Sequence, residues 1–209
     1  MYFITGATGL VGIAILKSLA LQGKKIKVFH RPESDLSIID NIKGDIISIE
    51  GSLDDIPLLT EELKGIDTII HAAALVSFDP KDKENLYHSN VIGTKSLVDS
   101  ALISEVPNFI HISSVAAIGK EKESQTVTEN TQWIESSLNS AYGKSKHLAE
   151  LEVWRGYEEG LNGFILNPSI ILGKGDWNRS SSKLLKFIHT HKNHYPEGTM
   201  NFVDLRDVR

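Results

Sequence analysis

The sequence predicts an α/β protein built on a doubly wound parallel β-sheet, followed by a small C-terminal region. First, short apolar runs alternate with stretches of helical periodicity along most of the 209 residues. Second, a glycine-rich turn separates the first predicted strand from the first predicted helix. Third, a hydrophobic content of 41% is enough for one substantial core. Because alternating strands and helices form parallel sheets, we expect helices on both faces.

The expected elements follow from these patterns in chain order. Strands are expected at Tyr2–Thr5, Lys25–Phe29, Asp45–Glu50, Thr68–Ala72, Phe109–Ser113 and Gly163–Leu166. Helices are expected at Leu10–Leu21, Asp54–Leu63, Glu84–Ser104 and Tyr142–Tyr157. The less regular stretches Lys120–Asn139 and Gly173–Thr199 interrupt this rhythm. We therefore expect one domain over residues 1–172 and the start of a second region over 173–209, with a sheet-completing segment near 200–208.

Composition and charge exclude several classes of function. A net charge of −5 without a block of Lys or Arg argues against nucleic acid and against an anionic membrane as partners. The chain has no cysteine, which excludes disulfides, thiol catalysis and cysteine–zinc sites. No apolar run reaches transmembrane length, and Met1 leads into the first strand without a signal peptide. We therefore expect a cytoplasmic protein.

The glycine-rich turn has the spacing of a dinucleotide-binding loop. Gly6 permits the tight turn, Gly9 admits a pyrophosphate close to the backbone, and Gly12 lets the helix pack near the strand. The helix N-terminus offers free N–H groups to phosphate. An ordinary strand–turn–helix that carries three glycines is the alternative. We favour a Rossmann-type NAD(P)-binding domain over residues 1–172, with cofactor contacts from Gly6, Thr8, Gly9, Leu10, Val11 and Gly12.

The end of the second strand distinguishes NAD from NADP. NAD-selective proteins carry Asp or Glu there, which binds the ribose hydroxyls. This chain has His30-Arg31-Pro32 and no acidic residue over positions 28–32. The planar guanidinium of Arg31 can pair with a 2′-phosphate, so NADP(H) is favoured over NAD(H). A solvated turn residue is the alternative role for Arg31.

A second group of residues has the chemistry of proton transfer. Tyr142 and Lys146 are four residues apart in a predicted helix and therefore share one face. A neighbouring ammonium lowers the pKa of a phenol, so Tyr142 can exchange a proton near neutral pH. Ser113 and Ser114 end a predicted strand, where a hydroxyl can hold the oxygen of a carbonyl substrate.

Together these motifs resemble the extended short-chain dehydrogenase/reductases, also called the NAD-dependent epimerase/dehydratase family. The similarity covers the chain from end to end. The matching stretches, in family order, are Thr5–Gly12, His71–Ala74, Asn90–Thr94, Ser113–Gly119, Tyr142–Lys146, Asn167–Gly173 and Phe202–Val208.

The resemblance implies a role for individual residues. Ser114, Tyr142 and Lys146 would be the catalytic triad: Tyr142 is the acid, Lys146 lowers its pKa and binds the nicotinamide ribose, and Ser114 positions the substrate oxygen. Tyr142 and Lys146 would also contact the cofactor. Its other contacts would be Ser52, Leu53, Ala72, Ala73, Ala74, Asn90, Asn167, Pro168 and Ile170.

The chain departs from the family pattern in three places. Ser52 stands where the family often has Asp, and Asn167 stands where it usually has Arg. Relatives continue beyond the position of Arg209 to complete a substrate domain, so we expect residues 173–209 to be the start of an incomplete substrate-binding region.

The stretch Ser113–Gly119 resembles the branch of dihydroflavonol reductases and hydroxysteroid dehydrogenases. It implies an NADP-dependent reductase of a small-molecule aldehyde or ketone. A nucleotide-sugar epimerase with tightly bound NAD and a non-catalytic cofactor sensor are the alternatives.

His189, His191 and His194 lack a carboxylate at matching spacing, so we expect no metal site. The resemblance also implies a homodimer through the two long helices, whose apolar Leu97, Leu102, Leu148 and Leu151 fit that interface or packing on the sheet equally well.

Overall fold

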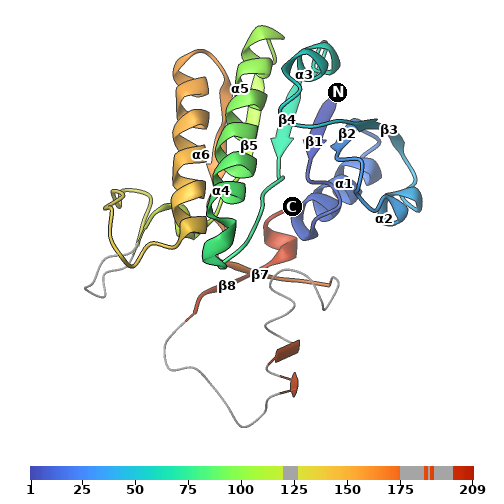
Figure 1. Cartoon of the computed structure of the whole chain (residues 1–209). Coiled ribbons are helices and arrows are strands. Elements are labelled where there is room, and N and C mark those ends of the chain that lie inside the picture. The colour runs from blue at the N-terminus through green and yellow to red at the C-terminus, as the bar shows by residue number, and fades with distance from the viewer. Residues whose placement is uncertain (120–126, 175–185, 188, 191–199) are drawn as a thin grey trace.

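The computed structural model describes residues 1–119, 127–174, 186–187, 189–190 and 200–209 (Figure 1). Its main feature is a six-stranded sheet in the order β3-β2-β1-β4-β5-β6, with every neighbouring pair parallel. The strands are β1 (Tyr2–Thr5), β2 (Lys25–His30), β3 (Asp45–Glu50), β4 (Thr68–His71), β5 (Asn108–Ile112) and β6 (Asn162–Leu166). The chain adds β2 and β3 on one side of β1 and then β4, β5 and β6 on its other side. The predicted doubly wound α/β fold is therefore confirmed.

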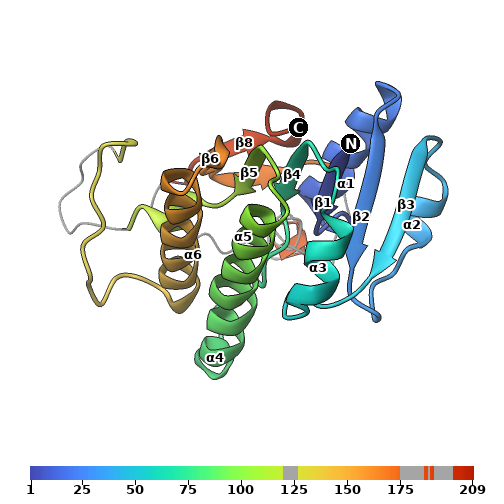
Figure 2. The same cartoon turned by 90° about the horizontal axis from the view of Figure 1, so that it is seen from above.

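Helices cover both faces of the sheet (Figure 2). One face carries α1 (Leu10–Leu21) and α2 (Ser37–Asp40), and the other carries α3 (Ile56–Glu62), α4 (Lys83–Leu86), α5 (Gly93–Ile103) and α6 (Ala141–Glu158). Short 3₁₀ turns lie at Pro80–Asp82, Val115–Ala117 and Leu205–Asp207. Of the described helices, none has the length and apolar character that a membrane span requires.

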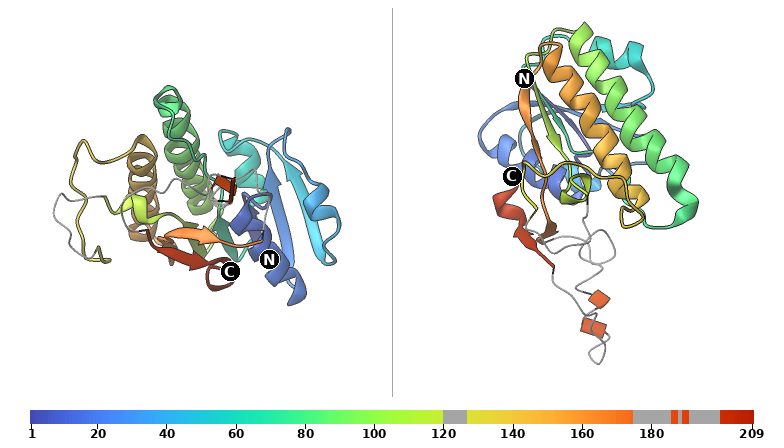
Figure 3. Two further views of the ribbon diagram at one scale, coloured as in Figure 1. Left: turned by 90° about the horizontal axis from the view of Figure 1, so that it is seen from below. Right: turned by 90° about the vertical axis from the view of Figure 1, so that its left-hand side faces the viewer.

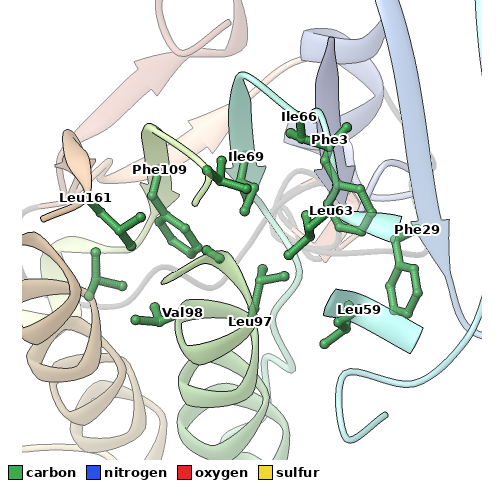
Figure 4. Packing of buried hydrophobic residues seen from close by; sticks show 13 residues of the cluster. Phe3, Phe29, Leu59, Leu63, Ile66, Ile69, Leu97, Val98, Phe109 and Leu161 are labelled. Carbon is green, nitrogen blue, oxygen red and sulfur yellow. The ribbon is translucent and has the colours of Figure 1, made fainter. Parts of the chain in front are cut away.

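The alternation of side chains along the strands gives each face its own core. Phe3 and Ile4, consecutive in β1, belong to different clusters because neighbouring strand residues point to opposite faces. Figure 4 shows the larger cluster, in which Leu97 and Val98 of α5 pack beneath Phe109 of β5. Burial of each large apolar side chain contributes about 1.5–3 kcal/mol, so these clusters hold the helices on the sheet.

The predicted helix Glu84–Ser104 has a wider middle turn than a regular helix. The chain runs from α4 through a π-helical turn, Tyr87–Ile92, directly into α5. The hydroxyl of Thr94 donates to the carbonyl oxygen of Asn90 (2.6 Å), which is the acceptor that the Thr94 N–H would use in an α-helix. π-Helical turns are frequent at functional sites, and this one presents Asn90 beneath the carboxyl end of β4.

The C-terminal residues add a small second sheet. Strand β7 (Ile170–Leu172) pairs in parallel with β8 (Phe202–Asp204), beyond the carboxyl ends of the main sheet (Figures 1 and 3). The segment predicted near 200–208 thus forms β8 and the turn Leu205–Asp207. Most of Gly173–Thr199 and part of Lys120–Asn139 lie outside the described residues.

Candidate active site and cofactor cleft

A cavity of about 410 Å³ opens at the carboxyl ends of β1, β2 and β4. It brings together segments that are far apart in the sequence, at the edge of the sheet where α/β proteins bind ligands. Its lining includes nine of the predicted cofactor residues: Gly6, Thr8, Gly9, Arg31, Ser52, Leu53, Ala72, Ala73 and Ala74. Leu10, Val11 and Gly12 do not line it and form the first turn of α1.

The three glycines of the loop are required for different reasons. Gly6 has φ +72°, and a Cβ there would lie 2.5 Å from the backbone nitrogen of Ala73. A Cβ at Gly12 would overlap the carbonyl oxygen of Gly6. At Gly9, by contrast, the nearest atom would be the oxygen of Gly6 at 3.2 Å, a tight contact that a backbone shift of a few tenths of an ångström relieves. Glycine at position 9 keeps the cavity open for a ligand.

The N-terminus of α1 fits an anionic ligand. Gly9 is the N-cap of this helix, and no side chain caps it in the described part of the chain. The first-turn N–H groups and the positive end of the helix dipole are therefore available to a phosphate. The residues present accordingly fit the pyrophosphate of a dinucleotide.

The opposite end of the cavity is polar. The Arg31 side chain is 72% exposed and, among the described residues, forms an ion pair only with Glu33 (3.5 Å), so its guanidinium can bind a further anion. The hydroxyl of Ser52 donates to Asp54 (3.1 Å), whose carboxylate also lies 3.6 Å from His88. Asp54 was not predicted from the sequence, although it lies two residues after Ser52. His88 was not predicted either, because its approach to Asp54 depends on the tertiary fold. The other lining residues that were not predicted are Thr5, Ala7, Phe29, His30, Ser34, Gly51, Leu75, Ser89 and Gly93.

Ser114 and Tyr142 meet where α6 packs against the turn Val115–Ala117. Ser140 caps α6 by accepting from the Gly143 N–H (3.0 Å), and a Cβ at Gly143 would lie 2.8 Å from the oxygen of Ala116. This close approach places the hydroxyl of Tyr142 in a hydrogen bond with that of Ser114. Burial raises the pKa of Tyr142, and the bond to Ser114 acts in the opposite direction. The phenol is therefore protonated at neutral pH.

Lys146 lies one helical turn after Tyr142 and is 1% exposed. Its Nζ donates to the carbonyl oxygen of Ile112 (3.0 Å) and lies 3.3 Å from Nε2 of His111. Burial lowers the pKa of Lys146 to about 8, and the charge of Glu150 acts in the opposite direction. The sequence predicted that Lys146 would lower the pKa of Tyr142. In this arrangement the ammonium contacts β5, and burial is the largest influence on the pKa of Tyr142, so the lowering by Lys146 stays a prediction.

Two buried histidines support the site from the strands. Burial, helped by the charge of Lys146, lowers the pKa of His71 to about 3, and the pKa of His111 is lowered by the same causes. Neutral His71 bonds to Thr5 (2.7 Å) and to Thr94 (2.9 Å). Because the Thr94 proton is donated to Asn90, His71 carries its proton on Nε2 and accepts from the hydroxyl of Thr5. This chain of bonds links β1, β4 and the π-helical turn.

Asn90 connects the loop after β4 to the tyrosine helix. Its side chain accepts from the Leu75 N–H (2.8 Å) and donates to the Leu75 carbonyl (3.0 Å). It also donates to the hydroxyl of Ser145 (2.9 Å), which itself donates to the carbonyl of Tyr142 (2.8 Å). Phe78, 76% exposed in the same loop, packs edge-on against Tyr142 with ring centroids 5.9 Å apart. An apolar side chain thus borders the phenol.

The remaining predicted cofactor residues lie between β6 and β7. The amide of Asn167 donates to the carbonyl of Ser114 (3.1 Å) and to Glu150 (2.5 Å). The carbonyl of Pro168 accepts from the Val115 N–H (3.1 Å), and Ile170 begins β7. Asn167 and Pro168 therefore both bind the peptide group between Ser114 and Val115.

The described residues contain no group of three or more His, Asp or Glu side chains placed to bind a metal ion. His191 and His194 of the histidine cluster lie outside the described residues.

Comparisons with known proteins place this architecture in one family. The model of the NAD dependent epimerase/dehydratase family matches residues 2–207. A protein of Synechocystis sp. named "Putative dihydroflavonol 4-reductase" is 32% identical over 99% of this chain and 60% of its own length. Sterol demethylase protein B of Methylococcus capsulatus is 30% identical over 98% of this chain and 62% of its own length. The chain thus spans about three fifths of the length of these relatives.

Solved structures agree with this placement. The crystal structure of gox2253 superposes with a TM-score of 0.88 at 33% identity, covering 100% of this chain and 63% of that one. A short-chain dehydrogenase/reductase superfamily protein of Agrobacterium tumefaciens with bound NAD superposes with a TM-score of 0.77 at 26% identity, covering 99% and 70%. The family matched and the relative named as a reductase agree with the predicted resemblance. The chain belongs to the NAD dependent epimerase/dehydratase family.

Proposed function

We propose that this protein is an NADP-dependent oxidoreductase that reduces a small-molecule aldehyde or ketone. The observation that carries the proposal is the hydroxyl pair of Ser114 and Tyr142, which lies one helical turn from buried Lys146. The raised pKa of Tyr142 keeps its phenol in the protonated form that reduction of a carbonyl requires. Relatives named as reductases, including cinnamoyl-CoA reductase 1 of Petunia hybrida, support the same class of reaction.

Separate groups of residues would bind the cofactor, donate the proton and stabilise the charge in this reaction. The glycine loop, Arg31 and the segment Ala72–Ala74 would hold the dinucleotide, which supplies the hydride when it is bound. Ser114 donates a hydrogen bond to the carbonyl oxygen, and Tyr142 transfers its phenolic proton to the same oxygen as the carbon accepts the hydride. The carbonyl becomes an alcohol, and the positive charge of Lys146 stabilises the phenolate that remains. Phe78 favours a carbonyl that carries an apolar group.

The preference for NADP is tested by titrating the chain with NADPH and with NADH, following cofactor fluorescence, and by assaying NADPH consumption with aldehydes and ketones. We expect tighter binding of NADPH. Arg31→Glu should weaken NADPH about 10–100-fold, because a charge-assisted hydrogen bond to phosphate is replaced by repulsion. NADH lacks the 2′-phosphate and is the internal control. Preference for NADH, or NAD that co-purifies and resists washing, would favour the nucleotide-sugar epimerase instead.

We also propose that the chain forms a homodimer through the outer face of α5 and α6, which lie side by side (Figure 3). Leu151 and Trp154 of α6 are 50% and 53% exposed, whereas Leu97 is fully buried in the core and is not available to a partner. Light scattering should give twice the monomer mass, and Leu151→Lys with Trp154→Lys should halve it. Leu21→Lys, an exposed position on α1, is the control and should leave the mass unchanged.

A further inference from the structure

Glu150 is a partly buried carboxylate on α6 that the proposed mechanism does not use. It follows Lys146 by one helical turn, so the two side chains share the face of α6 that packs on the sheet. The amide nitrogen of Asn167 donates to Oε1 of Glu150 at 2.5 Å. The same nitrogen donates to the backbone carbonyl of Ser114 at 3.1 Å. The amide of Asn167 therefore connects the carboxylate of Glu150 with the backbone of Ser114 through two hydrogen bonds.

The charges around Lys146 show what this carboxylate does. Lys146 is 1% exposed, and its ammonium meets His111 from β5 and lies near His71 of β4. Both imidazoles are neutral, because burial and the charge of Lys146 lower the pKa of each. Tyr142 and Tyr157, the other titratable side chains on the core side of α6, are neutral phenols, because burial raises the pKa of each. Among the described residues, Glu150 is thus the negative charge that acts on Lys146.

The influence is mutual, although the ion pairs among the described residues do not include a direct one between Lys146 and Glu150. Burial raises the pKa of Glu150, while the neighbouring hydroxyl of Ser113, the hydrogen bond from Asn167 and the positive charge of Lys146 act in the opposite direction. A buried ion is stable only when it is paired and hydrogen-bonded. Ser113 and Asn167 supply the hydrogen-bond donors, and Lys146 supplies the charge.

We propose that Glu150 is a positioning residue for the reduction: its carboxylate, oriented by Asn167, is the counter-ion of Lys146. The inference deepens the proposed function and rests on it, because it concerns the protonated form of Lys146, whose charge stabilises the phenolate of Tyr142 in the proposed reduction. It also gives Asn167 a role through protein contacts, between Ser114 and Glu150. Without the carboxylate, the buried ammonium loses its proton at a lower pH, and the phenolate left on Tyr142 loses its stabilising charge.

The test is the pH profile of Glu150→Gln, which keeps the acceptor for Asn167 and removes the charge. In the parent chain, kcat/KM for NADPH-dependent reduction should fall as the pH rises through about 8, the pKa of Lys146. In Glu150→Gln this fall should move about one pH unit lower, with rates at pH 6 within about threefold of the parent. Glu158→Gln, an exposed carboxylate at the end of the same helix, is the matched control and should not move the profile.

Two further measurements separate this inference from the proposed function. NMR titration of ¹³C-labelled lysine, with Lys146→Met to assign the signal, follows the ammonium itself and needs no substrate. A lower titration midpoint in Glu150→Gln supports the pairing even if no carbonyl is reduced. An unchanged midpoint overturns it and leaves the reductase proposal intact. Should Glu150→Gln fail to fold, Asn167→Ala should move the same midpoint down by a smaller amount, and no movement would refute the role of Asn167.

Discussion

Tyr142→Phe is expected to lower NADPH-dependent carbonyl reduction by about 10²–10⁴-fold, which is the range for loss of a positioned general acid. The change removes one oxygen atom, and with it the proton donor and the hydrogen-bond partner of Ser114. The ring remains, so its contact with Phe78 persists. We therefore expect kcat to fall while the chain stays folded and the Kd of NADPH changes by less than about threefold.

Tyr157→Phe is the matched control, because it removes a phenolic hydroxyl from the same helix. The hydroxyl of Tyr157 donates to the carbonyl of Phe109 (2.8 Å), on the core side of α6. Its loss should cost about 1 kcal/mol of stability and leave the reduction rate unchanged. Activity retained in Tyr142→Phe would argue against catalysis by this residue. If the biological effect of the protein also persisted, the cofactor-sensor interpretation would gain support.

Gly9→Ala should weaken dinucleotide binding by at least about tenfold, or about 1.4 kcal/mol, without unfolding the chain. Gly9 has φ −84° and ψ 169°, a backbone conformation that alanine adopts without strain. Its new methyl group would lie 3.2 Å from the oxygen of Gly6 and would occupy the space where a pyrophosphate approaches the backbone. Cofactor fluorescence and thermal unfolding measure the two quantities separately.

Gly12→Ala, one helical turn further on, should give the opposite result. Its methyl group would overlap the carbonyl oxygen of Gly6, a backbone atom that cannot move aside without displacing β1 from α1. We expect a loss of more than about 3 kcal/mol of unfolding free energy, which exceeds the usual cost of overpacking. If both variants folded equally well and bound the dinucleotide equally tightly, the assignment of the cavity would be wrong.

Local sequence patterns predicted most elements of the fold because each pattern is short in range. The apolar spacing and flanking glycines of Leu10–Leu21 set the bounds of α1, and Asp45–Glu50 became β3 over the predicted residues. The π-helical turn was missed, since the helical period is nearly the same on both sides of it. Strand β7 was missed because it has three residues and its partner β8 lies about thirty residues further along the chain.

The candidate site likewise contains residues that the sequence predicts and contacts that only the fold creates. The glycine loop and the Tyr142–Lys146 spacing can be recognised in the sequence because each lies within one turn and one helix. The contact between Asp54 and His88 has no such local pattern, because these two residues lie 34 positions apart in the sequence.

By itself, the sequence determined the parallel α/β architecture, the dinucleotide loop and the residue types able to transfer a proton, since all of these depend on neighbours within a few positions. The tertiary structure decided that the ammonium of Lys146 faces Ile112 and His111, and that Asn167 bridges Ser114 and Glu150. These arrangements depend on how α6 packs against the ends of β5 and β6. Burial there sets the charge of each group, and burial is a property of the packed fold that no local pattern contains.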